Sequence, residues 1–162
     1  MIDATTIIDY SFSDFSAGID SIANAIKSSG WSPDYIVGIV RGGSIPAVFL
    51  SHKLNVPVQM VHWNTRDTSK WISNEHNCWV PEDIHEGAQV LIVDDIVDGG
   101  DTIKELLDDW QKSIAGLGDL PLQNIRVAAM YYNTAQDVVV DFYHRTIDRN
   151  EDPRWIIFPW EA

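Results

Sequence analysis

The sequence predicts an α/β fold in which a mostly parallel central sheet is flanked by helices. Continuous apolar segments such as 35–40 and 90–93 have the composition of strands that a parallel sheet buries on both faces. Segments with a helical spacing of apolar residues alternate with these strands. At 41–43 and 98–102 a strand leads through a glycine turn into a helix, so both turns lie at carboxyl ends of strands, where such sheets bind ligands.

Each element follows from local signals. Asp14 is a plausible N-cap for a first helix, whose apolar spacing ends at residues 28–30. Pro46 suits the first turn of a second helix that runs to His52, whereas residues 1–13 show no clear pattern. The other expected elements are strands over 35–40, 56–61, 90–93, 124–132, 138–143 and 155–158, and a helix over 103–116.

Length and composition indicate a soluble protein of one domain, spanning 1–162. The apolar fraction of 45% is typical of globular chains, and no apolar run approaches the roughly 20 residues that a membrane span needs. The N-terminus carries Asp3 and Asp9 and no basic start, unlike a secretory signal. We therefore expect a cytoplasmic protein with no membrane partner.

The charge and cysteine content exclude several classes of function. A formal net charge of −13 opposes binding to nucleic acid, which depends on Lys and Arg neutralising phosphates. The single cysteine, Cys78, excludes an internal disulfide framework and has no cluster of positive charge around it in the sequence. A polyanionic substrate must therefore be held by local backbone donors and a metal ion.

The most informative segment is 90–103, in which an apolar strand ends in Asp94 and Asp95 and leads through Gly99 and Gly100 into a helix. Backbone N–H groups in a glycine turn and at a helix N-terminus bind an anion without any basic side chain. The two carboxylates either accept hydrogen bonds from sugar hydroxyls or hold a hydrated magnesium ion beside a phosphorylated ligand. These groups together indicate a sugar phosphate.

This segment resembles the 5-phosphoribosyl-1-pyrophosphate (PRPP) binding signature of type I phosphoribosyltransferases. The family usually has Thr or Ser at the position of Gly99, and Gly or Lys at that of Asp101. Gly99 lacks a hydroxyl donor to the 5′-phosphate, and Asp101 adds a negative charge near a phosphate, which is expected to weaken binding unless Asp101 turns to solvent. The residues that match the signature are Asp94, Asp95, Asp98, Gly100 and Thr102.

The resemblance implies a Rossmann-like type I phosphoribosyltransferase fold with a small hood and a flexible catalytic loop. It also implies roles for the acidic residues: Asp98 accepts or orients a proton of the base. Asp94 and Asp95 address the ribose hydroxyls directly or through a Mg²⁺ ion, and residues 98–102, including Gly99 and Asp101, cradle the 5′-phosphate.

Two other segments are expected to hold the pyrophosphate. The resemblance implies that Arg41, Gly42 and Gly43 bind it, with a non-proline cis peptide between Arg41 and Gly42. Residues 63–88 lack periodicity and are too long for an ordinary connection, so we expect the flexible loop there. Its basic residues, Arg66 and Lys70, are candidates for pyrophosphate contacts.

The C-terminal segment resembles the ending of small xanthine-guanine and hypoxanthine-guanine type purine phosphoribosyltransferases. The resemblance implies a hood over about 133–162 in which Trp155 stacks on the base and the backbone from Ile156 to Glu161 reads the edge of the base. Relatives that use 6-oxopurines usually have a Lys where this chain has Asn133. An amide both donates and accepts, so an amino base is not excluded and the identity of the base stays open.

The resemblance thus predicts a Mg²⁺-dependent enzyme that joins a purine base to PRPP, as in purine salvage, and that forms a homo-oligomer, either a dimer or a tetramer. Two alternatives stay open. One is a noncatalytic PRPP-sensing regulator on the same fold, and the other is a phosphoribosyltransferase for a pyrimidine or other base.

Overall fold

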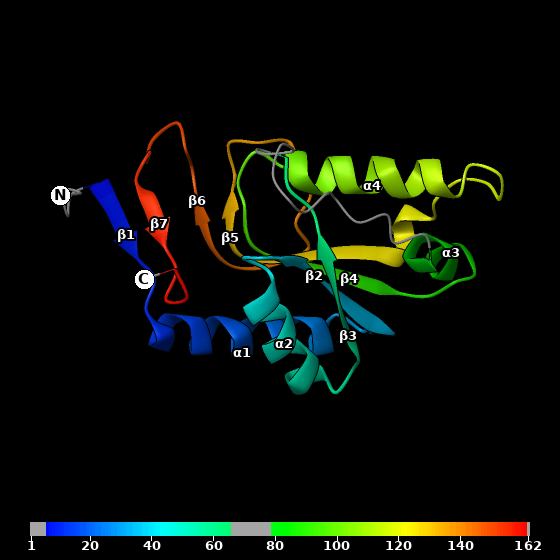
Figure 1. Ribbon diagram of the computed structural model, residues 1–162. Coiled ribbons are helices and arrows are strands. Elements are labelled where there is room, and N and C mark those ends of the chain that lie inside the picture. The colour runs from blue at the N-terminus through cyan, green and yellow to red at the C-terminus, as the bar shows by residue number, and fades with distance from the viewer. Residues whose placement is uncertain (1–5, 66–78, 162) are drawn as a thin grey trace.

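The computed structural model describes residues 6–65 and 79–161. Within them, five strands form one sheet in the order β3-β2-β4-β5-β6, and every neighbouring pair is parallel (Figure 1). The predicted α/β fold is therefore confirmed. The elements are β1 (Ile7–Asp9), α1 (Phe12–Ser28), β2 (Tyr35–Val40), α2 (Ser44–Leu54), β3 (Val58–His62), α3 (Trp79–His85), β4 (Val90–Val97), α4 (Asp101–Ser113), a short 3₁₀ turn η2 (Leu122–Asn124), β5 (Ile125–Asn133), β6 (Phe142–Ile147) and β7 (Trp155–Ile157).

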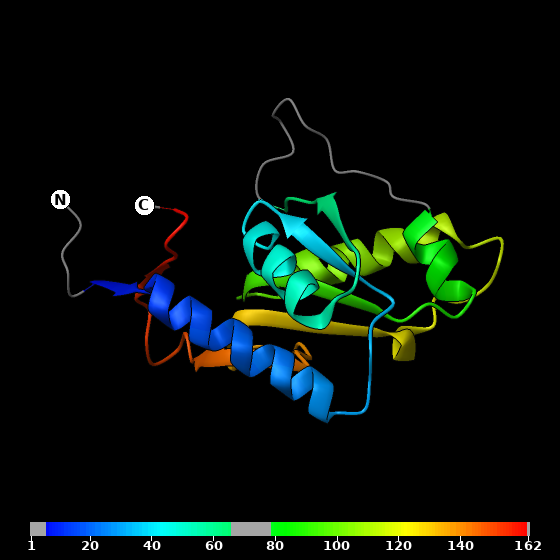
Figure 2. The ribbon, with the colours of Figure 1, turned by 90° about the horizontal axis from the view of Figure 1, so that it is seen from below.

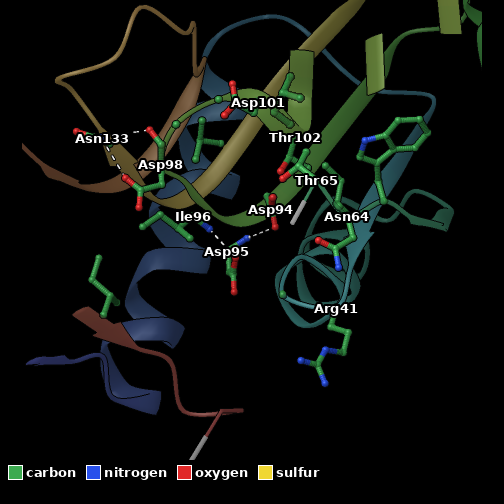
Figure 3. A pocket seen from close by; sticks show the side chains of 18 of the residues that line it. Arg41, Asn64, Thr65, Asp94, Asp95, Ile96, Asp98, Asp101, Thr102 and Asn133 are labelled. Atoms are coloured by element: carbon green, nitrogen blue, oxygen red, sulfur yellow. Dashed lines mark hydrogen bonds between the residues drawn. The ribbon is translucent and has the colours of Figure 1, made fainter. Parts of the chain in front are cut away.

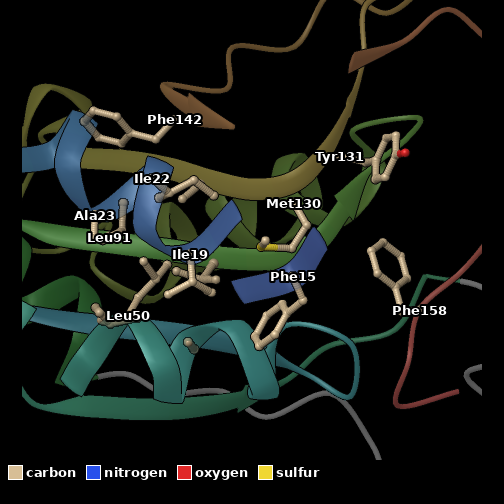
Figure 4. Close-up of a cluster of buried hydrophobic side chains, with 14 of the residues drawn as sticks. Phe15, Ile19, Ile22, Ala23, Leu50, Leu91, Met130, Tyr131, Phe142 and Phe158 are labelled. Carbon is tan, nitrogen blue, oxygen red and sulfur yellow. The ribbon is translucent and has the colours of Figure 1, made fainter. Parts of the chain in front are cut away.

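Two hydrophobic clusters hold the helices against the sheet, one on each face. Helices α1 and α2 cover one face, and α3 and α4 cover the other (Figure 1). The first cluster places Ile19 and Ile22 of α1 and Leu50 of α2 against Leu91 of β4 (Figure 4). The second packs Leu106 and Trp110 of α4 against the opposite face. Strand β4 is buried from both sides, which explains its continuous apolar sequence.

Helix α1 begins three residues earlier than predicted. Ser11, rather than Asp14, is its N-cap, and the Ser11 hydroxyl accepts a hydrogen bond from the backbone N–H of Asp14. The Asp14 carboxylate in turn accepts from the backbone N–H of Ser11, which completes a capping box. None of the helices within 6–65 and 79–161 is long and apolar enough to cross a membrane.

The segment predicted as one irregular loop over 63–88 contains a helix near its end. Helix α3 is too short to show a sustained apolar repeat, but Val80 and Ile84 lie one turn apart and are both buried. Pro81 lies in the first turn, where no backbone N–H is needed. Trp79 also packs beside the ring of Tyr35, at 6.0 Å between centroids. The prediction of a loop is therefore wrong for residues 79–85.

The C-terminal part of the chain differs from the predicted hood in two ways. The strand predicted over 138–143 is β6, which lies at 142–147 and belongs to the main sheet beside β5. The apolar residues Val138 and Val140 instead pack in the connection between β5 and β6. The hood is a separate parallel pair of strands, β1 and β7, at one end of α1 (Figure 2). Strand β1 was not predicted, because residues 1–13 show no clear pattern of apolar residues.

Candidate active site

A cleft of about 1100 Å³ opens at the carboxyl ends of β2, β4 and β5 and reaches the hood (Figure 3). This is the edge of the sheet where both glycine turns were predicted to lie. Arg41 lies toward one end of the cleft, and Asp98 with Asn133 lies toward the other (Figure 3). The predicted site residues that line the cleft are Arg41, Gly42, Asp94, Asp95, Asp98, Gly99, Gly100, Asp101, Thr102, Asn133, Trp155, Ile156 and Glu161.

Asp94 and Asp95 stand in the middle of the cleft with one oxygen each already engaged. Oδ1 of Asp94 accepts from the backbone N–H of Asp95 at 2.9 Å, and Oδ1 of Asp95 accepts from that of Ile96 at 2.8 Å. Within the described part of the chain, neither Oδ2 accepts a backbone N–H. Burial raises the pKa of Asp94 well above its usual value, and the neighbouring Asp95 charge raises it further. Burial also raises the pKa of Asp95, with a contribution from Glu161.

The turn after β2 brings its backbone against the carboxylate of Asp95. An added Cβ on Gly42 would lie 2.1 Å from Oδ2 of Asp95, so only glycine allows this approach. An added Cβ on Gly43 would lie 2.3 Å from the carbonyl oxygen of Val93. The predicted non-proline cis peptide is present, but it joins Val40 to Arg41, so its predicted place between Arg41 and Gly42 is wrong.

The second glycine turn leads from β4 into α4 and also needs glycine at one position. Gly100 has a φ of 80°, and an added Cβ would lie 2.0 Å from Cγ2 of Val138. The N-terminus of α4 lies at the cleft, where Thr102 and Gly99 line the wall. The first N–H groups of a helix have no acceptor within the helix, so this turn offers donors to an anion.

Asp98 is held by two residues from other strands' ends. Nδ2 of Asn133 donates to Oδ1 of Asp98 at 3.1 Å and lies 3.2 Å from its backbone oxygen. Nε of Arg149 donates to the same Oδ1 at 3.2 Å. Sequence reasoning missed Arg149, because the segment after β6 shows no pattern that links it to a residue 51 positions earlier.

Asn133 does not have the free amide that the sequence suggested. Its Oδ1 accepts from the backbone N–H groups of Ala135 and Arg149, and its Nδ2 is used by Asp98. These partners fix the orientation of the amide. Asn133 is also only 1% exposed. Its direct contact with a base stays a prediction, and the structure gives it a second task, which is to position Asp98 and the backbone of Arg149.

The hood separates the two C-terminal tryptophans. Both line the cleft, but Trp155 has 55% of its surface exposed, whereas Trp160 is half-buried and stacked on Phe158 with ring centroids 5.1 Å apart. Ile156 is buried in the first hydrophobic cluster. Oε2 of Glu161 accepts from the backbone N–H of Phe158, so this carboxylate closes the C-terminal turn. Because the ring of Trp160 is already stacked on Phe158, Trp155 is the tryptophan with the freer ring face for a ligand. Arg66 and Lys70 lie outside the described residues.

Comparison with known proteins agrees with this geometry. The model of the phosphoribosyl transferase domain family matches residues 12–162. The chain belongs to this family. It is therefore an enzyme of the phosphoribosyltransferase class, and the resemblance seen in 90–103 is confirmed.

The chain is similar to individual phosphoribosyltransferases that act on different bases. A xanthine-guanine phosphoribosyltransferase of Cereibacter sphaeroides is 27% identical over 153 residues, covering 88% of this chain and 80% of the relative. The crystal structure of a purine phosphoribosyltransferase from Pyrococcus horikoshii is 25% identical with a TM-score of 0.72, covering 97% of this chain and 95% of the other. An orotate phosphoribosyltransferase of Brucella ovis is 34% identical over 91 residues, but these cover 54% of this chain and 42% of the relative.

The position of Gly99 in this phosphoribosyltransferase is open to a larger residue. An added Cβ would have only Asp101 near it, at 3.5 Å from Oδ2. We expect Gly99→Ser to restore the hydroxyl donor that the family usually has and to lower the Kd for PRPP by about three- to tenfold, the effect of about one hydrogen bond to a charged group. Calorimetry in the presence of Mg²⁺ measures this change. Unchanged or weaker binding would mean that the 5′-phosphate does not reach residue 99.

Asp101 places a charge beside the same turn. It is the first residue of α4, where a carboxylate favours the helix, and it is exposed. Asp101→Asn keeps the shape and removes the charge, and we expect it to tighten PRPP binding by about two- to fourfold, as for an exposed charge pair. The gain should shrink when the salt concentration is raised. A loss of affinity would instead show that Asp101 orders the turn.

Proposed function

We propose that this protein transfers the 5-phosphoribosyl group of PRPP to a purine base, giving a nucleoside monophosphate and pyrophosphate. The observation that carries the proposal is that one cleft is lined by both the PRPP signature at 94–102 and the half-exposed Trp155. An indole face offers a flat platform for a purine, and such stacking commonly contributes ~1–3 kcal/mol. The purine phosphoribosyltransferase with a TM-score of 0.72 supports the same choice of base.

Different residues along the cleft bind different parts of the two substrates. In the proposed complex, the N–H groups of 98–102 hold the 5′-phosphate, and Arg41 with the turn behind it holds the pyrophosphate at the opposite side of Asp94 and Asp95. These two carboxylates accept from the ribose hydroxyls. Trp155 and Asp98 then hold the base on the hood side of the ribose.

Asp94 and Asp95 also fit a Mg²⁺ ion. Only Oδ1 of each carboxylate accepts a backbone N–H among residues 6–65 and 79–161, which leaves both Oδ2 atoms at the cleft, and a cation would offset the desolvation of the two carboxylates. No group of three or more potential metal ligands occurs in that part of the chain, so water and substrate oxygens must supply the remaining ligands. When bound, Mg²⁺ would neutralise charge on the pyrophosphate as it leaves.

The chemical step forms a bond from a ring nitrogen of the base to C1 of the ribose and breaks the bond from C1 to pyrophosphate. Because C1 gains positive charge on the way, the nearby carboxylates of Asp94 and Asp95 favour the transition state. Asp98 accepts the proton on the imidazole ring of the base, or orients it, so that the attacking nitrogen keeps its lone pair aimed at C1. Positioning of the two substrates supplies the rest of the rate gain.

A release assay for pyrophosphate tests the proposal directly. The protein is incubated with PRPP, Mg²⁺ and one base at a time: guanine, xanthine, hypoxanthine, adenine or orotate. Turnover with a purine supports the proposal. Turnover with orotate alone favours the second candidate, a pyrimidine enzyme, for which the relative of Brucella ovis provides the specific observation. PRPP binding without turnover on any base would favour the noncatalytic regulator.

A further inference from the structure

Arg149 brings a guanidinium to the base end of the cleft with donors to spare. Its side chain is 18% exposed and lines the cleft. Nε donates to Asp98, and Nη1 donates to the backbone oxygen of Arg154. A guanidinium carries five N–H groups, and the others on Arg149 have no acceptor among the described residues. A partly buried cation with unfilled donors is a recognition group for a ligand that carries acceptors.

Asp98 places an acceptor directly beside these donors. Its Oδ1 is filled by Asn133 and Arg149, whereas Oδ2 has no hydrogen-bond partner in the described part of the chain. The ion pair is anchored from behind, because Asn133 holds both the Asp98 side chain and the backbone N–H of Arg149. A ligand in the cleft therefore faces a fixed acceptor, Oδ2 of Asp98, next to fixed donors, the remaining N–H groups of Arg149.

The edge of a 6-oxopurine complements this pair. With a proton on N7, guanine, hypoxanthine and xanthine present an N–H donor beside the exocyclic oxygen O6, which is an acceptor. Adenine presents the same N–H beside an amino group, so both positions are donors. Adenine would leave the guanidinium facing a second donor, and unpaired donors in a partly buried site cost free energy.

We propose that the Arg149–Asp98 ion pair reads the N7–O6 edge of the base and makes this protein select 6-oxopurines over adenine. The inference rests on the proposed transfer to purine bases. It assigns to Arg149, which follows β6, the cationic role that a Lys at position 133 would have, and it leaves Asn133 as the positioning residue of the pair. It also replaces the expectation that Asn133 leaves the choice among purines open.

The test compares Arg149→Gln with Arg154→Gln. Arg154 lies in the same segment and does not line the cleft, and its guanidinium pairs with Asp152 at 2.7 Å. Both variants lose one positive charge, and the backbone oxygen of Arg154 is kept. We expect Arg149→Gln to lower the ratio of kcat/KM for guanine to that for adenine by about 10- to 100-fold, the range for one good recognition pair. Arg154→Gln should change that ratio by less than about twofold.

A second variant protects the test against loss of the fold. Arg149→Lys keeps the charge but lacks the planar fork, so it cannot serve Asp98, Arg154 and a base together. We expect a raised KM for guanine, an unchanged KM for PRPP and an intermediate ratio. Circular dichroism and thermal unfolding check each variant, and Arg149→Lys decides the matter if Arg149→Gln is unfolded.

The failure of this inference differs from failure of the proposed function. A guanine-to-adenine ratio that is the same in the unmodified protein and both Arg149 variants overturns the role of Arg149 while leaving the transferase intact. If the unmodified protein releases no pyrophosphate with any base, the proposed function fails. Calorimetry with GMP and AMP on the same proteins then measures the selectivity for the base. A preference for GMP that Arg149→Gln abolishes supports the role of the ion pair, and the absence of such a preference refutes that role.

Discussion

Replacement of Asp94 and Asp95 by Asn is expected to abolish PRPP binding and, at the same time, to stabilise the fold. The change keeps the Oδ1 acceptors that the backbone N–H groups of Asp95 and Ile96 use. It removes the charges on which the proposed contacts to a metal ion and to the ribose hydroxyls depend. We expect the affinity for PRPP with Mg²⁺, measured by calorimetry, to fall at least about 100-fold, the loss of two or more charge-assisted interactions.

The gain in stability follows from the raised pKa values of the two carboxyls. Burial holds both pKa values above the usual Asp value, so the folded protein binds these protons more tightly than the unfolded chain. Stability is therefore full below the unfolded value of about 3.9 and falls as the pH rises through the raised folded pKa. The double variant lacks this loss. Each kcal/mol regained near neutral pH raises the Tm by about 2–4 °C in a chain of this size.

A surface pair gives the matched control. Asp108 and Asp119 are exposed and do not line the cleft, and Asp108→Asn with Asp119→Asn changes the net charge by the same amount. We expect this control to keep PRPP binding and to shift the Tm by less than the site variant does. Full PRPP affinity in the Asp94/Asp95 variant would refute the role of these carboxylates. A lower Tm would show that their charges support the fold.

Replacement of Gly43 by Ala is expected to cost about 2–4 kcal/mol of unfolding free energy, because the added methyl group overpacks a rigid site. The Cβ would lie 2.3 Å from the carbonyl oxygen of Val93, and 2.7 and 2.9 Å from the backbone oxygen and nitrogen of Ile39. All three are backbone atoms of the central sheet, so β2 and β4 must separate. Urea denaturation measures the loss, and PRPP binding should weaken with it because the turn after β2 must shift.

Gly116 provides the control for this substitution. It has no atom within 4 Å of an added Cβ and no positive φ, so Gly116→Ala should leave the unfolding free energy within about 0.5 kcal/mol. If Gly43→Ala were as stable as Gly116→Ala, the close approach of the turn to β4 would not exist in solution. If Gly43→Ala kept its stability but lost PRPP binding, the added methyl group would shift only the turn after β2 and leave the sheet intact.

Local pattern was enough to predict most of the core of this fold. The apolar runs of β2 and β4 predicted buried parallel strands, because a strand covered on both faces needs apolar residues at every position. The glycine turns after these strands predicted a phosphate site, because glycine allows the tight turn that leaves backbone N–H groups free to bind an anion. By contrast, α3 is shorter than the window in which an apolar repeat can be recognised.

What the sequence by itself determined was the α/β sheet, the PRPP signature at 94–102 and, with them, the family. Only the tertiary structure decided that β1 pairs with β7 in the hood. It also decided that the amide of Asn133 is hydrogen-bonded to neighbouring groups of the protein, and that Arg149 lines the cleft beside Asp98. The physical reason is the range of the interactions. Strand and turn preferences act between residues close in sequence, whereas the ion pair joins residues 51 positions apart and forms only when the ends of β4, β5 and β6 meet at one edge of the sheet.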